Sequence, residues 1–158
     1  MSATSCIIVG IFICVLAAAV DQSPTTLRAT APVGTGFSTV DLFVDSGKEP
    51  LAAWQMEFKA TAGQMEIVGI ERGDHKDFQD PPYYDPAAMS GDRIVVGAFN
   101  ITDRLPVGKI RVARLHLHVG GGVKPVYAVN LVVAGDKEGK PITAQGSFAL
   151  GKSEGEEK

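Results

Sequence analysis

The chain has 158 residues, of which 45% are hydrophobic and 21% are charged, and these values are typical of one globular domain. Fifteen basic and eighteen acidic residues give a formal net charge of −3, so the chain lacks the broad positive field that binds polyanions. We therefore do not expect nucleic acid as a partner. The chain is long enough to bury a hydrophobic core.

The segment 1–19 is predicted to be an export leader. Fifteen uncharged residues run from Cys6 to Val20, which is short for a membrane span of about 20 residues and suits the core of a signal peptide. Ala17 and Ala19 form an A-x-A pattern, which predicts cleavage after Ala19. A retained membrane anchor is the alternative, because Met1 to Ser5 carries no basic side chain. Both interpretations predict a secreted or cell-envelope protein, with the membrane contacted only through an uncleaved leader.

The remainder of the chain is predicted to be all-β. Both cysteines lie within the leader, so we expect no disulfide in the domain that follows. Glycines and prolines separate short segments rich in Val, Ile, Phe and Thr, a pattern typical of strands. We expect about nine strands over 25–151 and a disordered polar tail over 152–158. Eight of these strands are placed, at 25–31, 38–46, 52–60, 65–72, 92–100, 109–119, 126–134 and 142–150.

The third of these segments alternates between apolar and polar residues. Trp54, Met56 and Phe58 share one side of an extended chain. A single open sheet of this size would leave an apolar face in water, so we expect a two-sheet antiparallel sandwich with these residues in its core. The other side of the strand is polar and is expected to meet a partner; it carries Gln55, Glu57 and Lys59.

Three later strands have patterns of their own. The segment 65–72 is expected to kink at Gly69, and the apolar run Ile94–Phe99 predicts a central strand covered on both faces. In 109–119 the apolar residues change phase, which predicts a bulge near Ala113. With that bulge, four polar side chains would face outward together, namely Arg111, Arg114, His116 and His118.

The order and spacing of these segments resemble a cohesin domain, a bacterial module of extracellular scaffolding proteins. The resemblance is carried by STVDLFVDSG, LAAWQMEFKA, MEIVGIERG, DRIVVGAFN, GKIRVARLHLHV and AQGSFALG, and it covers nearly all of 25–151. It implies a flattened sandwich of jelly-roll topology that binds a dockerin module through the sheet made by strands three, five, six and eight. Here that sheet would comprise Ala52–Ala60, Ile94–Phe99, Ile110–Val119 and Val126–Ala134.

The resulting hypothesis is an exported, non-catalytic binding or assembly module that docks a dockerin-like or other envelope protein through one sheet face. The expected contact surface has mixed charge, which suits polar, salt-sensitive recognition. It comprises Gln55, Glu57, Lys59, Arg111, Arg114, His116 and His118. An enzyme is not expected, because the sequence has no G-x-S-x-G motif, no phosphate-binding glycine loop and no cysteine after the leader.

The loop 73–92 supplies an alternative function. Tyr83 and Tyr84 are adjacent aromatic residues, and such a pair can stack on sugar rings. The alternative function is therefore a carbohydrate-binding module with polysaccharide as its partner. The same loop is rich in carboxylates, which are calcium ligands, although their spacing matches no calcium-loop signature. These are Asp74, Asp77, Asp80, Asp85 and Asp92. We expect no cofactor, with calcium as the alternative.

His116 and His118 supply a second alternative, a metal-dependent enzyme. Two histidines at positions i and i+2 of a strand project from one face, a spacing that can chelate zinc. A competent site needs a third ligand, and the remaining histidine, His75, lies in the distant loop. We therefore expect no metal at this pair.

Overall fold

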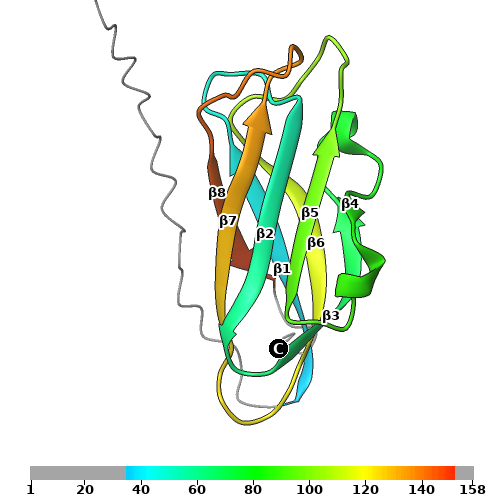
Figure 1. The fold of residues 1–158 in the computed structure, drawn as a ribbon, viewed down its shortest axis with the longest axis vertical. Coiled ribbons are helices and arrows are strands. Elements are labelled where there is room, and N and C mark those ends of the chain that lie inside the picture. The colour runs from blue at the N-terminus through cyan, green and yellow to red at the C-terminus, as the bar shows by residue number, and fades with distance from the viewer. Residues whose placement is uncertain (1–34, 152–158) are drawn as a thin grey trace, which may run out of the picture.

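The computed structural model describes residues 35–151, which form two four-stranded antiparallel sheets packed face to face (Figure 1). One sheet has the strand order β3-β6-β1-β8 and the other β4-β5-β2-β7. The strands are β1 Gly36–Asp45, β2 Ala53–Ala62, β3 Met65–Arg72, β4 Tyr83–Tyr84, β5 Arg93–Phe99, β6 Lys109–Val119, β7 Val126–Gly135 and β8 Gln145–Leu150. Two short 3₁₀ turns flank β4, η1 at Lys76–Phe78 and η2 at Pro86–Ala88. The predicted two-sheet sandwich is confirmed.

Alternation decides which side of each strand is buried. In β2, Trp54, Met56 and Phe58 are at most 2% exposed, as their spacing predicts. In β1, Val40 and Leu42 belong to the inward set, and Asp41 between them faces outward. The polar sides of both sheets therefore form the two outer faces of the sandwich.

Four strands contain one extra residue relative to a neighbour. In β2 it is Thr61, because Ala60 pairs with Tyr127 and Ala62 pairs with Val126. In β6 it is Val112, because Ala113 pairs with Leu42 and Arg111 pairs with Phe43. Val112 and Ala113 are consequently both buried, which confirms the bulge predicted from the change of phase. Val68 is the extra residue of β3, beside the predicted kink at Gly69. Val132 is the extra residue of β7, between Leu131 and Val133.

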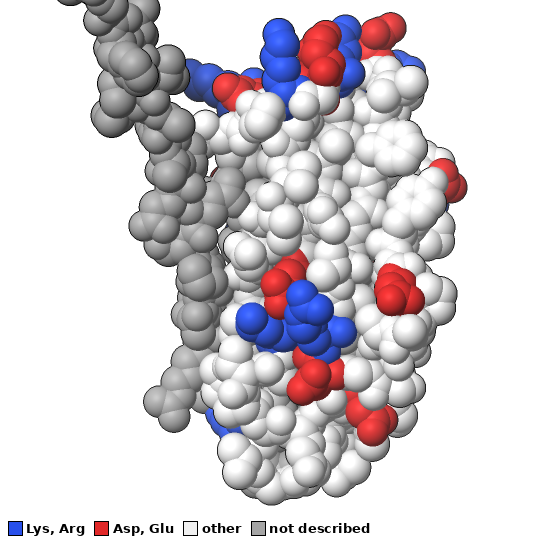
Figure 2. Space-filling model, viewed as in Figure 1, with Lys and Arg blue, Asp and Glu red and all other residues white. Residues whose placement is uncertain are grey.

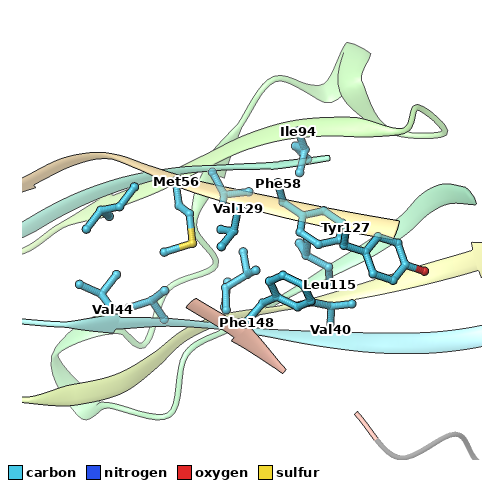
Figure 3. Packing of buried hydrophobic residues seen from close by; sticks show 14 of the residues in the cluster. Val40, Val44, Met56, Phe58, Ile94, Leu115, Tyr127, Val129 and Phe148 are labelled. Carbon is cyan, nitrogen blue, oxygen red and sulfur yellow. The ribbon is translucent and has the colours of Figure 1, made fainter. Parts of the chain in front are cut away.

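Aromatic side chains from both sheets meet in the core (Figure 3). The ring centroids of Phe58 and Tyr127 lie 5.3 Å apart, and Phe148 of the opposite sheet meets both rings edge-on at 6.2 and 6.3 Å. Burial of each such side chain contributes about 1.5–3 kcal/mol in area terms, so this cluster joins the two layers.

Several details of the predicted strands require correction. Strand β6 belongs to the sheet of β1 and β3, so Ile110–Val119 does not lie beside Ala52–Ala60. Strand β5 does lie inside its sheet, but Phe99 on its outer face is 65% exposed, so the prediction of a strand covered on both faces is wrong. The two-residue strand β4 was not predicted. The strand expected at 25–31, the leader and the tail lie outside the described residues.

Candidate functional site

The outer face of the β4-β5-β2-β7 sheet carries a group of exposed apolar side chains, which we call the aromatic patch. It is defined by Tyr83, Phe99, Val132 and Val133, which are 71%, 65%, 49% and 43% exposed. The rings of Tyr83 and Phe99 are nearly parallel, at 11°, with centroids 6.1 Å apart. On this face Figure 2 shows a broad area without charged side chains, lying between charged groups near the middle of the strands and others at one end.

Gly97 shapes the floor of the aromatic patch. It pairs with Tyr83 on one side and Gln55 on the other, and Gln55 pairs with Val133. A side chain at position 97 would bring its Cβ to 2.9 Å from the carbonyl oxygen of Trp54, so only glycine fits without a shift. The glycine leaves a depression of about 650 Å³ between the exposed side chains. This surface can take an apolar group of a partner.

A small charged cluster borders the aromatic patch on β2 and β5. The Nε of Arg93 donates to Oε1 of Glu57 at 2.8 Å, and Nζ of Lys59 lies 3.4 Å from the same oxygen. The hydrogen bond from Arg93 holds the pKa of the Glu57 carboxyl below its ordinary value. Gln55, Glu57 and Lys59 therefore lie together on one outer face, as alternation predicts.

The other half of the predicted contact surface lies on the opposite side of the molecule. Arg111, Arg114, His116 and His118 face outward together, as the bulge predicts, but from the β3-β6-β1-β8 sheet. The seven residues assigned to one mixed-charge face are thus divided between the two outer faces of the sandwich. The prediction that they form one contiguous surface is wrong, because it placed β6 beside β2.

Arg111, Arg114, His116 and His118 form a row along β6, and carboxylates bind the two arginines of this row. Arg114 binds Asp41 through two hydrogen bonds, Nε to Oδ1 at 2.7 Å and Nη2 to Oδ2 at 3.0 Å. Nη1 of Arg111 donates to Oδ1 of Asp41 at 3.1 Å, and its Nε donates to Oδ2 of Asp74 at 2.8 Å. Burial raises the pKa of Asp41, but the hydrogen bonds from Arg114 and Arg111 outweigh it, so the pKa lies below its ordinary value. These groups are ionised and paired at neutral pH.

Each histidine of the row also faces a carboxylate of β3. Nε2 of His116 lies 2.7 Å from Oε1 of Glu71, and Nδ1 of His118 lies 3.9 Å from Oε2 of Glu66. His75 is elsewhere, where its Nδ1 accepts the backbone N–H of Asp77 at 3.3 Å and caps η1. Within residues 35–151, no three His, Cys, Asp or Glu side chains are placed to hold a metal ion.

The loop between β3 and β5 places its predicted site residues apart. Asp74 binds Arg111, and Oδ1 of Asp85 accepts the backbone N–H of Ala87 at 2.9 Å to cap η2. Tyr83 pairs with Gly97 on the outer face, whereas Tyr84 pairs with Val96, which is fully buried. Neighbouring residues of a strand project to opposite sides, so Tyr83 and Tyr84 do not form one platform. Tyr83 forms its aromatic pair with Phe99 instead.

Four further residues on these faces were not identified from the sequence. Phe99 was assigned to a covered strand, and Val132 gains exposure through a bulge that no sequence signal marks. Asp41 and Glu71 occupy alternating polar positions of β1 and β3, which is a signal for outward orientation but not for a partner. The cross-strand register places both opposite Arg114, and from there Glu71 reaches His116 of the neighbouring rung.

Comparison of the chain with protein-family models, with curated proteins and with solved structures finds no match. Over residues 35–151 there is no helix with the length and apolar character needed to span a membrane.

Proposed function

We propose that the protein is an exported, non-catalytic binding module of cohesin-like, jelly-roll type that docks a protein partner through the outer face of the β4-β5-β2-β7 sheet. The observation that carries the proposal is the aromatic patch. Tyr83 and Phe99 each expose about two thirds or more of their surface on a flat sheet face. Exposed apolar patches bordered by polar groups are typical of protein contact surfaces, and aromatic residues are enriched in their centres.

The strand grouping supports the cohesin resemblance. If the strand expected at 25–31 is counted as the first, β2, β4, β5 and β7 are the third, fifth, sixth and eighth strands of the chain. These four form one sheet, and the same four positions form the binding sheet in the family that the sequence resembles. The sequence-based assignment missed β4, so β5 and β6 were each counted one place too early, whereas Val126–Ala134 was already assigned as the eighth strand.

The two outer faces differ in what they offer to a protein. On the face of β6, Asp41 and Asp74 bind the arginines, and the ionic groups are already paired within the domain. On the face of β2, two cations share one oxygen of Glu57 beside an uncharged apolar area. A partner with an apolar contact surface flanked by polar groups gains most on the second face, because apolar burial is the main driving force for association.

The test begins with affinity purification. The full chain, immobilised through a C-terminal tag, is incubated with cell-envelope extract, and retained proteins are identified and purified. The dissociation constant of the identified partner is then measured for the wild type and for Phe99→Ala. We expect the substitution to weaken binding by about tenfold or more, because truncation of a central aromatic residue typically costs that much.

Phe37→Ala is the matched control for this measurement. Phe37 is 74% exposed and lies on the β6 face, so the same truncation there should leave the partner's dissociation constant unchanged. The proposal is wrong if no protein is retained specifically, if Phe99→Ala has no effect, or if Phe37→Ala weakens binding equally.

A further inference from the structure

A depression on the outer face of the β3-β6-β1-β8 sheet gathers an aromatic ring and several polar groups. Three rungs cross the sheet here: Phe37–His118–Glu66, Thr39–His116–Gly69 and Asp41–Arg114–Glu71. In the middle rung His116 stands between Thr39 and Gly69, so no long side chain flanks it. A hollow of about 800 Å³, a size typical of small-ligand sites, lies over β1 and β6 and extends to Leu150, at the end of β8, and to Gly151. Its lining includes Phe37, Thr39, Asp41, Glu71, Arg114 and His116.

Gly69 helps to set the position of His116. A Cβ on Gly69 would lie 3.4 Å from Cβ and Cδ2 of His116, so the imidazole passes over the glycine. This orientation brings Nε2 to 2.7 Å from Glu71 of the next rung. The bidentate contact between Arg114 and Asp41 fixes the adjacent polar groups. The hydrogen-bonding groups of the hollow are therefore held in place before any ligand arrives.

The charges of the hollow argue against an ionic ligand. Arg114 is matched by Asp41, and Arg111 beside it is shared between Asp41 and Asp74. An anion would have to compete with these carboxylates, and within the described residues no group of three ligands is placed for a cation. What remains is a mixed set of donors and acceptors, in which Glu71 is the one carboxylate of the lining not matched by Arg114 and bonds to His116 instead.

Phe37 adds an apolar wall to this polar set. It is 74% exposed, and its ring lies against His118 with centroids 5.2 Å apart, which restricts its orientation. A sugar ring carries C–H groups on its face and hydroxyl groups, which both donate and accept hydrogen bonds, around its edge. An exposed aromatic ring beside fixed donors and acceptors matches both parts of such a ligand.

From this juxtaposition we propose that the Phe37 hollow is a binding site for a neutral sugar, taken as an oligosaccharide or as a unit of a polysaccharide. The aromatic patch on the opposite face fits a sugar less well. Its depression is lined by Gln55, Asp85 and Arg93 as well as by apolar groups, but Asp85 is bonded to the backbone of Ala87 and Arg93 to Glu57. The two outer faces would then bind different classes of ligand, and neither proposal rests on the other.

The test is affinity electrophoresis of the full chain in native gels that contain hydroxyethylcellulose, neutral xylan or galactomannan, followed by calorimetry with the matching hexasaccharide. We expect retardation by at least one of these polymers. Phe37→Ala and His116→Ala should each weaken binding by about tenfold or more, and circular dichroism should confirm that both variants are folded. Phe99→Ala is the matched control and should bind as the wild type does.

The other outcomes overturn the proposal. It is wrong if none of the three polymers retards the chain, or if only an anionic polymer such as polygalacturonate does. Loss of sugar binding in Phe99→Ala but not in Phe37→Ala would place the sugar on the aromatic patch instead. Partner capture through the β4-β5-β2-β7 face is measured separately, so failure of one proposal is distinguishable from failure of the other.

Discussion

At the scale of single residues, Asp41 of β1 binds two arginine side chains at once. It accepts three hydrogen bonds from two arginines of β6, and its side chain is only 16% exposed. Pairs of this kind contribute more than isolated surface pairs, because the bidentate geometry is fixed and water is partly excluded. Asp41 thus couples the central strand of its sheet to the neighbouring strand through side chains as well as backbone.

The lowered pKa of Asp41 makes this contribution depend on pH. A carboxyl group with a folded-state pKa below its unfolded value, about 3.9 for Asp, stabilises the fold above that value. The stabilisation is lost as pH falls through the folded-state pKa. Asp41→Asn should therefore be less stable than the wild type at pH 7, and the difference should shrink as the pH falls from about 4 towards 2.

Urea unfolding of the full chain at a series of pH values measures this difference. The amide of Asn is close in size to the carboxyl group, so the variant removes the charge and one of the two acceptor oxygens without leaving a cavity. A difference between the two proteins that stays constant from pH 7 to pH 2 would contradict the assignment.

Burial of individual residues could be predicted from the sequence, but their pairing could not. Alternation alone places Trp54 and Phe58 inside and Glu57 outside. It carries no information about which carboxylate meets which arginine, because Asp41 and Arg114 are 73 positions apart and meet only through the register of β1 with β6. The site residues of β6 were accordingly identified as outward-facing, while their partners Asp41 and Glu71 were missed.

At the scale of elements, seven of the eight described strands could be predicted from the sequence. The sheet to which β6 belongs could not be predicted. The residues of β6 show their bulge in the change of apolar phase, which is a local signal. The pairing of β6 with β1 and β3 depends on packing between segments that are far apart in the chain, and no local pattern indicates it. The strand β4 escaped prediction because two residues, Tyr83 and Tyr84, are too short to show alternation.

Gly97 and Gly69 both lie within strands, and the structure predicts that replacement by alanine destabilises the fold at Gly97 but has little effect at Gly69. Alanine at Gly97 would place its Cβ 2.9 Å from the backbone oxygen of Trp54, so β5 or β2 must shift, at a cost of about 1–3 kcal/mol in the free energy of unfolding. Alanine at Gly69 meets only His116 at 3.4 Å, which is ordinary contact, so stability should change by less than about 1 kcal/mol.

Chemical denaturation of Gly97→Ala and Gly69→Ala, compared with the wild type, tests this difference. Equal stability of the two variants would show that the approach of β5 to β2 is not as close as the structure places it.

At the scale of the whole molecule, the sheets connect segments that are far apart in the chain. Strand β1 pairs with β6 on one side and with β8, near the end of the described residues, on the other. Non-local pairing must overcome the entropy of closing long loops before contacts are gained, so such topologies fold slowly.

We therefore expect refolding from urea in milliseconds to seconds or longer, as is typical of all-β sandwiches. Trp54 is the single tryptophan and is 2% exposed, so its fluorescence in stopped-flow mixing reports formation of the core. Complete recovery of the native signal within the mixing dead time would contradict the long-range strand order.

The extra residue Val132 has a consequence for how separate copies of this protein meet. Within the described part of the chain, β7 lies at the edge of its sheet, and most of its ten residues are apolar. A straight strand of that composition offers unpaired N–H and C=O groups on which another molecule can add a strand. The irregularity interrupts that row and increases the local twist, so an incoming segment finds only short stretches to extend. The extra valine therefore makes the edge of β7 a poorer template for strand addition by another molecule.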